Sequence, residues 1–168
     1  MRQLMDIAED ARRVKHAVAA LGTNDKNRGL LAIADALLTH ADEIIAANRI
    51  DIENGRANGL NDGLIDRLTL DEKRIAGIAE GCRQVAALPD PIGEVLWMRK
   101  TPNGLNIGQK RVPMGVIGII YEARPNVTVD AAALCFKAGS ACILRGGKEA
   151  FHSSMCLTQI MRAALAAE

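Results

Sequence analysis

The fold is decided by the stretch Val116-Ile117-Gly118-Ile119-Ile120, an apolar and largely β-branched run typical of a buried strand. A polar turn follows it as far as Asn126, and the small residues from Thr128 to Lys137 favour a helix. A second apolar run, Ala141 to Leu144, ends in another polar turn. Two strands joined through a helix form a βαβ unit, in which ligands lie at the carboxyl ends of the parallel strands. We therefore expect an α/β fold with its functional residues in these two turns.

The residues before this unit divide into a helical part and a hairpin. Apolar residues at three- and four-residue spacing predict helices at 2–20, 30–38 and 44–58, and turn residues fill 58–63. Thr69 and Glu72 have the capping-box spacing and predict that a fourth helix begins there and runs to residue 87. Asn103-Gly104, between extended runs at 95–99 and 105–111, predicts a β-hairpin. A last helix is expected at 151–167, which divides the chain into parts at 1–92, 93–112 and 113–168.

Composition excludes several classes of function. The 168 residues are 49% hydrophobic and only 2% aromatic, which favours helices and α/β layers over a β-sandwich. A formal charge of +1 gives no reason to expect nucleic acid or an anionic membrane as partner. No signal peptide or membrane-spanning run is visible, and the four cysteines lack metal-ligand spacing. We expect a soluble cytoplasmic protein with reduced thiols and no metal.

The second turn, Arg145-Gly146-Gly147-Lys148-Glu149, has the residue types of an anion or nucleotide contact. Two glycines allow a ligand to approach the backbone closely, and they lead into a helix whose N-terminus favours negative charge. Arg145 and Lys148 add positive charge. An ordinary strand-to-helix turn with solvated charges explains the same residues, and neither standard phosphate-loop motif is present.

The first turn places a phenol, a carboxylate, a guanidinium and an amide after the strand, at Tyr121, Glu122, Arg124 and Asn126. Arg124 is suited to bind a carboxylate or phosphate in a bidentate manner. Asn126 has two possible roles: it can cap the following helix or donate to a developing oxyanion.

The cysteines are poor candidates for a nucleophile. Cys135 lies in an apolar helical segment, Cys142 in the second strand, and Cys82 and Cys156 on helices, none beside an evident activating base. The three histidines, at positions 16, 40 and 152, are isolated and are expected at the surface. We predict no catalytic residue among these groups.

Two motifs resemble the aldehyde dehydrogenase superfamily, and within it most closely the γ-glutamyl phosphate reductase family. They are the segment 111–130, RVPMGVIGIIYEARPNVTVD, and the segment 143–150, ILRGGKEA. The earlier helices and Asn48-Arg49-Ile50-Asp51 are also similar, so the resemblance covers essentially the whole chain. It implies a helical N-terminal cover at 1–92, an oligomerisation hairpin at 93–112 and, at 113–168, the opening βαβα of a Rossmann-type NADP-binding domain that is incomplete.

The resemblance also implies an activity: NADPH-dependent reduction of γ-glutamyl phosphate to glutamate 5-semialdehyde in proline biosynthesis, by a homo-oligomer. Arg124 and Asn126 match the region of the oxyanion or substrate contact. Lys148 stands where NAD-preferring aldehyde dehydrogenases carry a ribose-binding acid, so a cation there suits the 2′-phosphate of NADPH. The residues expected to bind the cofactor are Tyr121, Glu122, Pro125, Arg145, Gly146, Gly147 and Lys148.

The chain departs from this family in its length. Members are considerably longer, and their nucleophilic cysteine and catalytic domain follow the part that this chain resembles. We therefore expect an N-terminal portion that does not turn over alone and whose incomplete sheet promotes association. The alternative is a non-catalytic domain acting through oligomerisation or through complementation by a separate C-terminal chain. A small nucleotide-binding module unrelated to the family is disfavoured by the length of the 111–130 match.

Overall fold

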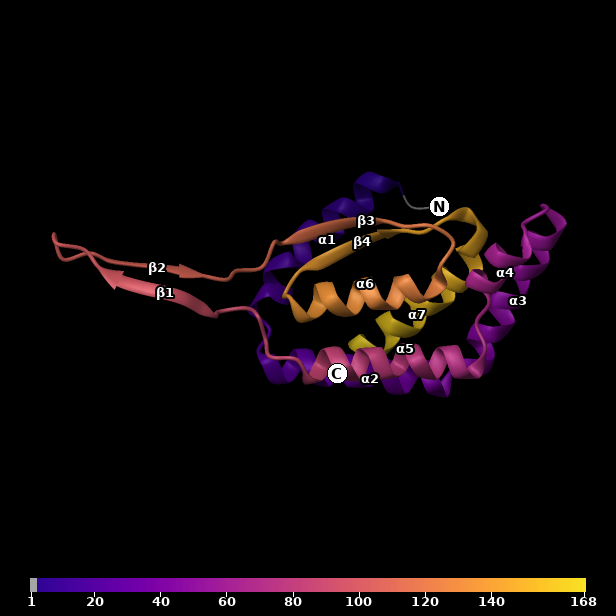
Figure 1. Ribbon diagram of the computed structural model, residues 1–168, viewed down its shortest axis with the longest axis horizontal. Helices are drawn as coiled ribbons and strands as arrows, with labels where there is room; N and C mark the ends of the chain where they lie inside the picture. Colours follow the sequence, from indigo (N-terminus) through magenta and orange to yellow (C-terminus); the bar gives the residue numbers. More distant parts are fainter. Residues whose placement is uncertain (1–2) are drawn as a thin grey trace.

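The computed structural model describes residues 3–168 and contains the predicted βαβ unit (Figure 1). Strand β3 (Val116–Ile120) pairs in parallel with β4 (Ala141–Arg145), and α6 (Pro125–Lys137) connects them. The register runs from Val116 opposite Ala141 to Ile120 opposite Arg145, so the two carboxyl ends lie level. Both predicted functional turns therefore lie at one end of the sheet.

The prediction that both strands are buried is wrong. The residues of β3 alternate between half-buried and exposed, Ile120 is 86% exposed, and β4 is half-buried up to its exposed last residue. The physical reason is the small number of neighbours: within residues 3–168, β4 is the only strand paired with β3, and α1 (Leu4–Ala20) contacts β4 more than β3. A strand of this composition is buried only where other elements cover both faces.

A helical layer packs on the other side of α6. It consists of α2 (Thr23–Thr39), α3 (Ala41–Ala57), α4 (Asp62–Leu68), α5 (Glu72–Ala87) and α7 (Phe151–Ala166), the last preceded by a 3₁₀ turn, Lys148–Ala150. Helix α2 packs against α5, α6 and α7, and one apolar core joins them. Its fully buried members include Leu30, Leu37, Ile44, Ile75 and Leu157. No helix within residues 3–168 has the length and apolar character needed to cross a membrane.

Helix ends differ from the predicted ones where two caps compete. Helix α4 begins at residue 62, inside the predicted turn 58–63, and Asn61 accepts a hydrogen bond from the Leu64 amide at 2.9 Å. The predicted cap Thr69 instead donates its hydroxyl to the Ile65 carbonyl at 2.7 Å, and so ends α4. Asp71 caps α5 in its place.

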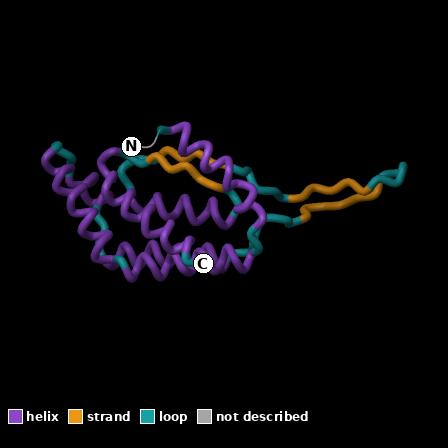
Figure 2. The backbone as a smooth tube through the Cα atoms, turned by 180° about the vertical axis from the view of Figure 1, so that it is seen from behind, coloured by secondary structure: helices purple, strands orange, loops and turns teal. Residues whose placement is uncertain are grey.

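The predicted hairpin is present and extends away from the rest of the protein (Figures 1 and 2). Strands β1 (Val95–Lys100) and β2 (Asn106–Lys110) pair antiparallel, and every residue of both is exposed. Gly104 in the connecting turn has φ +89°, which favours glycine. Large apolar side chains, among them Trp97 and Met98, face solvent on this arm.

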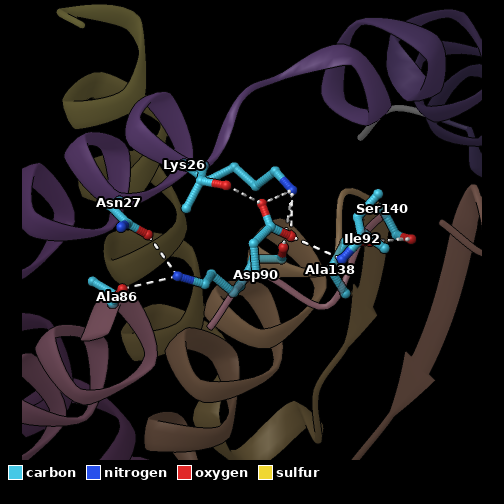
Figure 3. Close-up of polar contacts among 9 residues, drawn as sticks. Lys26, Asn27, Ala86, Asp90, Ile92, Ala138 and Ser140 are labelled. Carbon is cyan, nitrogen blue, oxygen red and sulfur yellow. Dashed lines mark hydrogen bonds and ion pairs between the residues drawn. The ribbon is translucent and has the colours of Figure 1, made fainter. Parts of the chain in front are cut away.

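Buried charges fix the link that leads from the helical layer to the hairpin (Figure 3). Lys26, only 1% exposed, donates to the Asp90 carboxylate at 2.7 and 3.0 Å. Asp90 also accepts hydrogen bonds from the Thr23 hydroxyl and the Ile92 amide, both at 2.9 Å. A second buried lysine, Lys137, donates to Asn27 Oδ1 at 2.6 Å and to the Ala86 carbonyl at 2.8 Å. These contacts join α2, the end of α5, the link and the end of α6.

Replacing Asp90 by Asn should strongly destabilise the fold, because the charge of Lys26 would remain buried without a counter-charge. We expect a loss of about 3 kcal/mol in the free energy of unfolding. Asp35→Asn, which removes an ion pair to Arg83 at the surface, should cost less than about 1 kcal/mol. Urea unfolding of both variants measures the difference, and equal losses would contradict the role given to Asp90.

The contribution of Asp90 should also depend on pH. Burial alone would raise its pKa, but hydrogen bonds from Lys26, the Ile92 amide and Thr23 together hold the pKa below its ordinary value of 3.8. Such a carboxylate stabilises the fold fully above its unfolded-state pKa, and loses that effect as the pH falls through its folded-state pKa. The stability difference between the wild type and Asp90→Asn should therefore be constant near neutral pH and shrink below pH 3.8.

The exposed apolar surface of β3 and the hairpin should drive self-association of the isolated chain. Sedimentation velocity is expected to detect species larger than a monomer. Ile120→Lys, at a position that is 86% exposed, should reduce their proportion without lowering stability. A wild-type chain that sediments as a single monomer and melts cooperatively would refute this prediction.

Candidate functional site

The two predicted turns lie against each other at the carboxyl end of the β3–β4 sheet. The Tyr121 amide donates to the Arg145 carbonyl at 3.1 Å, which continues the ladder past the end of β3. A Cβ atom placed on Gly147 would lie 3.1 Å from the Ala123 amide nitrogen. The structure thus brings the two turns together, as their positions after parallel strands predict.

Packing between the turns accounts for both glycines. A Cβ on Gly146 would lie 3.2 Å from the Tyr121 ring, and one on Gly147 would lie 2.8 Å from Glu149 Oε2 and 3.3 Å from the Glu122 carbonyl carbon. A Cβ atom at either position would need the facing turn to shift by a few tenths of an ångström, and one on Gly147 would also need the Glu149 side chain to move. Contacts within the protein therefore favour glycine at both positions, whether or not a ligand also approaches.

Tyr121 and Pro125 also take part in internal packing. The Tyr121 hydroxyl and the Thr128 hydroxyl lie 2.7 Å apart, and Thr128 donates in turn to Ser154 Oγ at 3.2 Å. This chain of hydroxyls ties the end of β3 to α6 and α7. Pro125 is fully buried as the first residue of α6, so its ring offers no surface to a ligand. The burial argues against the predicted cofactor contact of Pro125.

The N-terminus of α7 already holds an anion from the protein itself, which the sequence did not predict. Asp51 of α3, only 2% exposed, accepts hydrogen bonds from the backbone amides of His152 at 3.1 Å and Ser153 at 2.7 Å. Its carboxylate also accepts the Ser153 hydroxyl at 2.6 Å and contacts His152 Nδ1 at 2.8 Å. Two amides at this helix end are therefore already bonded to a carboxylate of the protein itself.

The positive side chains of the second turn remain accessible. Arg145 and Lys148 are both exposed, and the Arg145 guanidinium donates to the carbonyl of Gly146, which holds it beside its own turn. Glu122, on the facing turn, is exposed as well. An anionic ligand at this end of the sheet would therefore meet exposed side-chain cations.

The structure excludes the capping role of Asn126. The N-cap of α6 is Arg124, and Asn126 lies one residue inside the helix. The Asn126 amide donates to Asp130 Oδ2 at 3.1 Å, one helical turn further on. Arg124, Asn126 and Asp130 line one wall of an open cleft of about 450 Å³.

The rest of the cleft lining comes from the end of α4, the link to α5 and the first turns of α5. It includes Asp66, Arg67, Thr69, Leu70 and Arg74. Sequence reasoning missed this part of the lining because it predicted turn over 58–63 and no helix over 64–68. A signal was available: Asn61 stands at the N-cap position, and Leu64, Ile65 and Leu68 have helical spacing.

The cysteines have the character expected of structural thiols. Burial raises the pKa of Cys82 to about 11, with a further increase from Asp130 that Arg83 partly offsets. Burial likewise raises the pKa of Cys142 to about 11, with further increases from Cys135. The pKa values of Cys135 and Cys156 are also raised, mainly by burial. No group of residues within 3–168 has the composition of a metal site.

Substitution of Gly147 tests the contact between the turns. Gly147→Ala should destabilise the fold by about 1 to 3 kcal/mol, because its methyl group would press on Ala123 and Glu149. Gly118→Ala is the matched control, since a Cβ there meets no atom within 4 Å. Thermal unfolding compares the two, and a Gly147→Ala protein as stable as the control would show that the turns do not pack closely.

Comparison with known proteins finds relatives that match the chain over its whole length. No family model matches it. It is 55% identical over 168 residues to a γ-glutamyl phosphate reductase of Carboxydothermus hydrogenoformans, a match that covers 100% of this chain and 40% of the relative. The crystal structure of γ-glutamyl phosphate reductase from Thermotoga maritima superposes with a TM-score of 0.96 at 40% identity, over 99% of this chain and 40% of that one.

A structure with much lower sequence identity has a similar fold. A probable aldehyde dehydrogenase from Listeria monocytogenes superposes with a TM-score of 0.69 at 15% identity, over 97% of this chain and 33% of that protein. This confirms the expected partial aldehyde-dehydrogenase-like fold. The chain spans 40% of the length of the relative from Carboxydothermus hydrogenoformans. Over its whole length the chain is similar to these γ-glutamyl phosphate reductases, of which it matches the N-terminal portion.

Proposed function

We propose that the chain supplies the N-terminal part of an oxidoreductase of proline biosynthesis, which reduces γ-glutamyl phosphate to glutamate 5-semialdehyde with NADPH and releases phosphate. The observation that carries this proposal is the 55% identity over the entire chain to a γ-glutamyl phosphate reductase. The aldehyde-dehydrogenase-like fold supports a nicotinamide cofactor at the carboxyl ends of β3 and β4. The exposed apolar hairpin supports a homo-oligomer for the whole protein.

The residues at the sheet end fit such a cofactor in part. Arg145 and Lys148 are exposed cations of the kind that binds the ribose and a 2′-phosphate. The N-terminus of α7 is less available to a pyrophosphate group, because Asp51 accepts hydrogen bonds from the amides of His152 and Ser153. The fit to the cofactor therefore depends mainly on the charge of these two side chains.

The bound nicotinamide cofactor would supply hydride for the reduction. The residues of this chain would bind the cofactor and orient the substrate. Arg145 and Lys148 would hold the adenosine end of the cofactor, and the Asn126 amide would contact the substrate in the cleft. The contact with Asp130 fixes the Asn126 side chain, so the amide is oriented before substrate arrives. Buried thiols with raised pKa values do not provide a nucleophile. We accordingly expect no turnover by this chain alone.

Fluorescence titration with NADPH tests the proposed cofactor contact. Arg145→Ala should weaken binding about tenfold, because a charged hydrogen-bond donor to the ligand is lost. Lys148→Ala should reduce the preference for NADPH over NADH, measured in parallel. Lys100→Ala, in the distant hairpin, is the matched control and should leave binding unchanged. Absence of NADPH binding by the folded wild-type chain would contradict the proposal for these residues.

A further inference from the structure

The lining of the open cleft beside Asn126 includes guanidinium groups from two different elements. Arg124 stands at the start of α6, on the turn that follows β3. Arg67 lies in the last turn of α4. Figure 1 shows α4, its link to α5 and the turn between β3 and α6 at the same end of the molecule.

Among the three arginines of the cleft, one is committed to the fold. Arg74 donates to Asp66 Oδ1 at 2.6 Å and to the Thr69 carbonyl at 2.9 Å, and so holds the link between α4 and α5. Arg67 and Arg124 are exposed and have no side-chain partner among residues 3–168. Both remain available to a ligand.

The carboxylates of the cleft offset its positive charge only in part. Asp66 is paired with Arg74, and Asp130 accepts the hydrogen bond from the neutral Asn126 amide at 3.1 Å. The three arginines outnumber the two acids, so the cleft has an excess of positive charge. A ligand with two separated anionic groups would complement guanidinium groups that come from two elements of the lining.

We propose that Arg67 and Arg124 bind the two anionic ends of one substrate, an α-amino acid that carries a side-chain acyl phosphate. Arg124 receives the phosphate, because the neighbouring Asn126 is the proposed contact of the reacting carbonyl. Arg67, from α4, then receives the α-carboxylate and selects acyl phosphates that carry this second anion. The assignment rests on the proposed function and names substrate-binding residues from both elements.

Binding of a stable analogue tests the assignment. The probe is 2-amino-6-phosphonohexanoate, in which the same number of atoms separates the α-carbon from phosphorus as in γ-glutamyl phosphate. Calorimetric titration of the chain should give saturable binding. Arg67→Ala and Arg124→Ala should each weaken it about tenfold, the loss of one charge-assisted contact. Arg12→Ala, which alters an exposed arginine of α1 outside the cleft, should have no effect.

A second probe assigns each end. Hexylphosphonate, which lacks the amino-acid group, should bind more weakly than the first probe and should be insensitive to Arg67→Ala, while Arg124→Ala still weakens it. Loss of the first probe's affinity in Arg67→Ala, without loss for hexylphosphonate, would support the assignment. No binding of the first probe by the folded wild type, or equal binding by Arg67→Ala, would overturn it. The NADPH titration is independent, so the cofactor proposal can stand while this one fails.

Discussion

The arrangement of the helical layer and the βαβ unit depends on the largely buried carboxylate of Asp90. Apolar contacts hold α2, α5, α6 and α7 together, but burial of apolar surface has little directional preference. Hydrogen bonds to Asp90 from Lys26, Thr23 and the Ile92 amide are directional, and they fix the segment that leaves the helical layer. Lys26 also approaches the carbonyl of Lys137 at the end of α6, so the position of the βαβ unit is set by the same group.

Local patterns in the sequence predicted the elements well and their surroundings poorly. The βαβ unit and the hairpin follow from apolar runs and from Asn103-Gly104, signals that act over a few residues. Helix α4 was missed because it has only seven residues, about two helical turns, and one of them is a glycine. So short a segment shows little apolar periodicity. The predicted burial of β3 was wrong because the burial of a strand depends on neighbouring elements, which no stretch of five residues can specify.

For the candidate site, residue positions were predictable and several roles were not. The sequence placed Arg124, Asn126 and Arg145 on turns at one sheet end, since parallel strands dictate that geometry. The reason for the two glycines lies in contact between turns about 25 residues apart, which spacing alone does not reveal. The sequence pattern predicted where the cationic side chains of the two turns lie. Their hydrogen-bond partners could be identified only from the folded structure.

The carboxylate of Asp51 has a consequence for how the chain folds. It caps α7 across 102 residues of sequence, whereas most helices begin with a cap from their own first turn. In the unfolded chain the start of α7 therefore lacks this support, and nucleation of the helix is unfavourable until α3 is in place. Folding of α7 is thereby coupled to tertiary assembly. The helical layer and the turn that precedes α7 should consequently open as one cooperative unit in native-state hydrogen exchange, with no separate early loss of protection in α7.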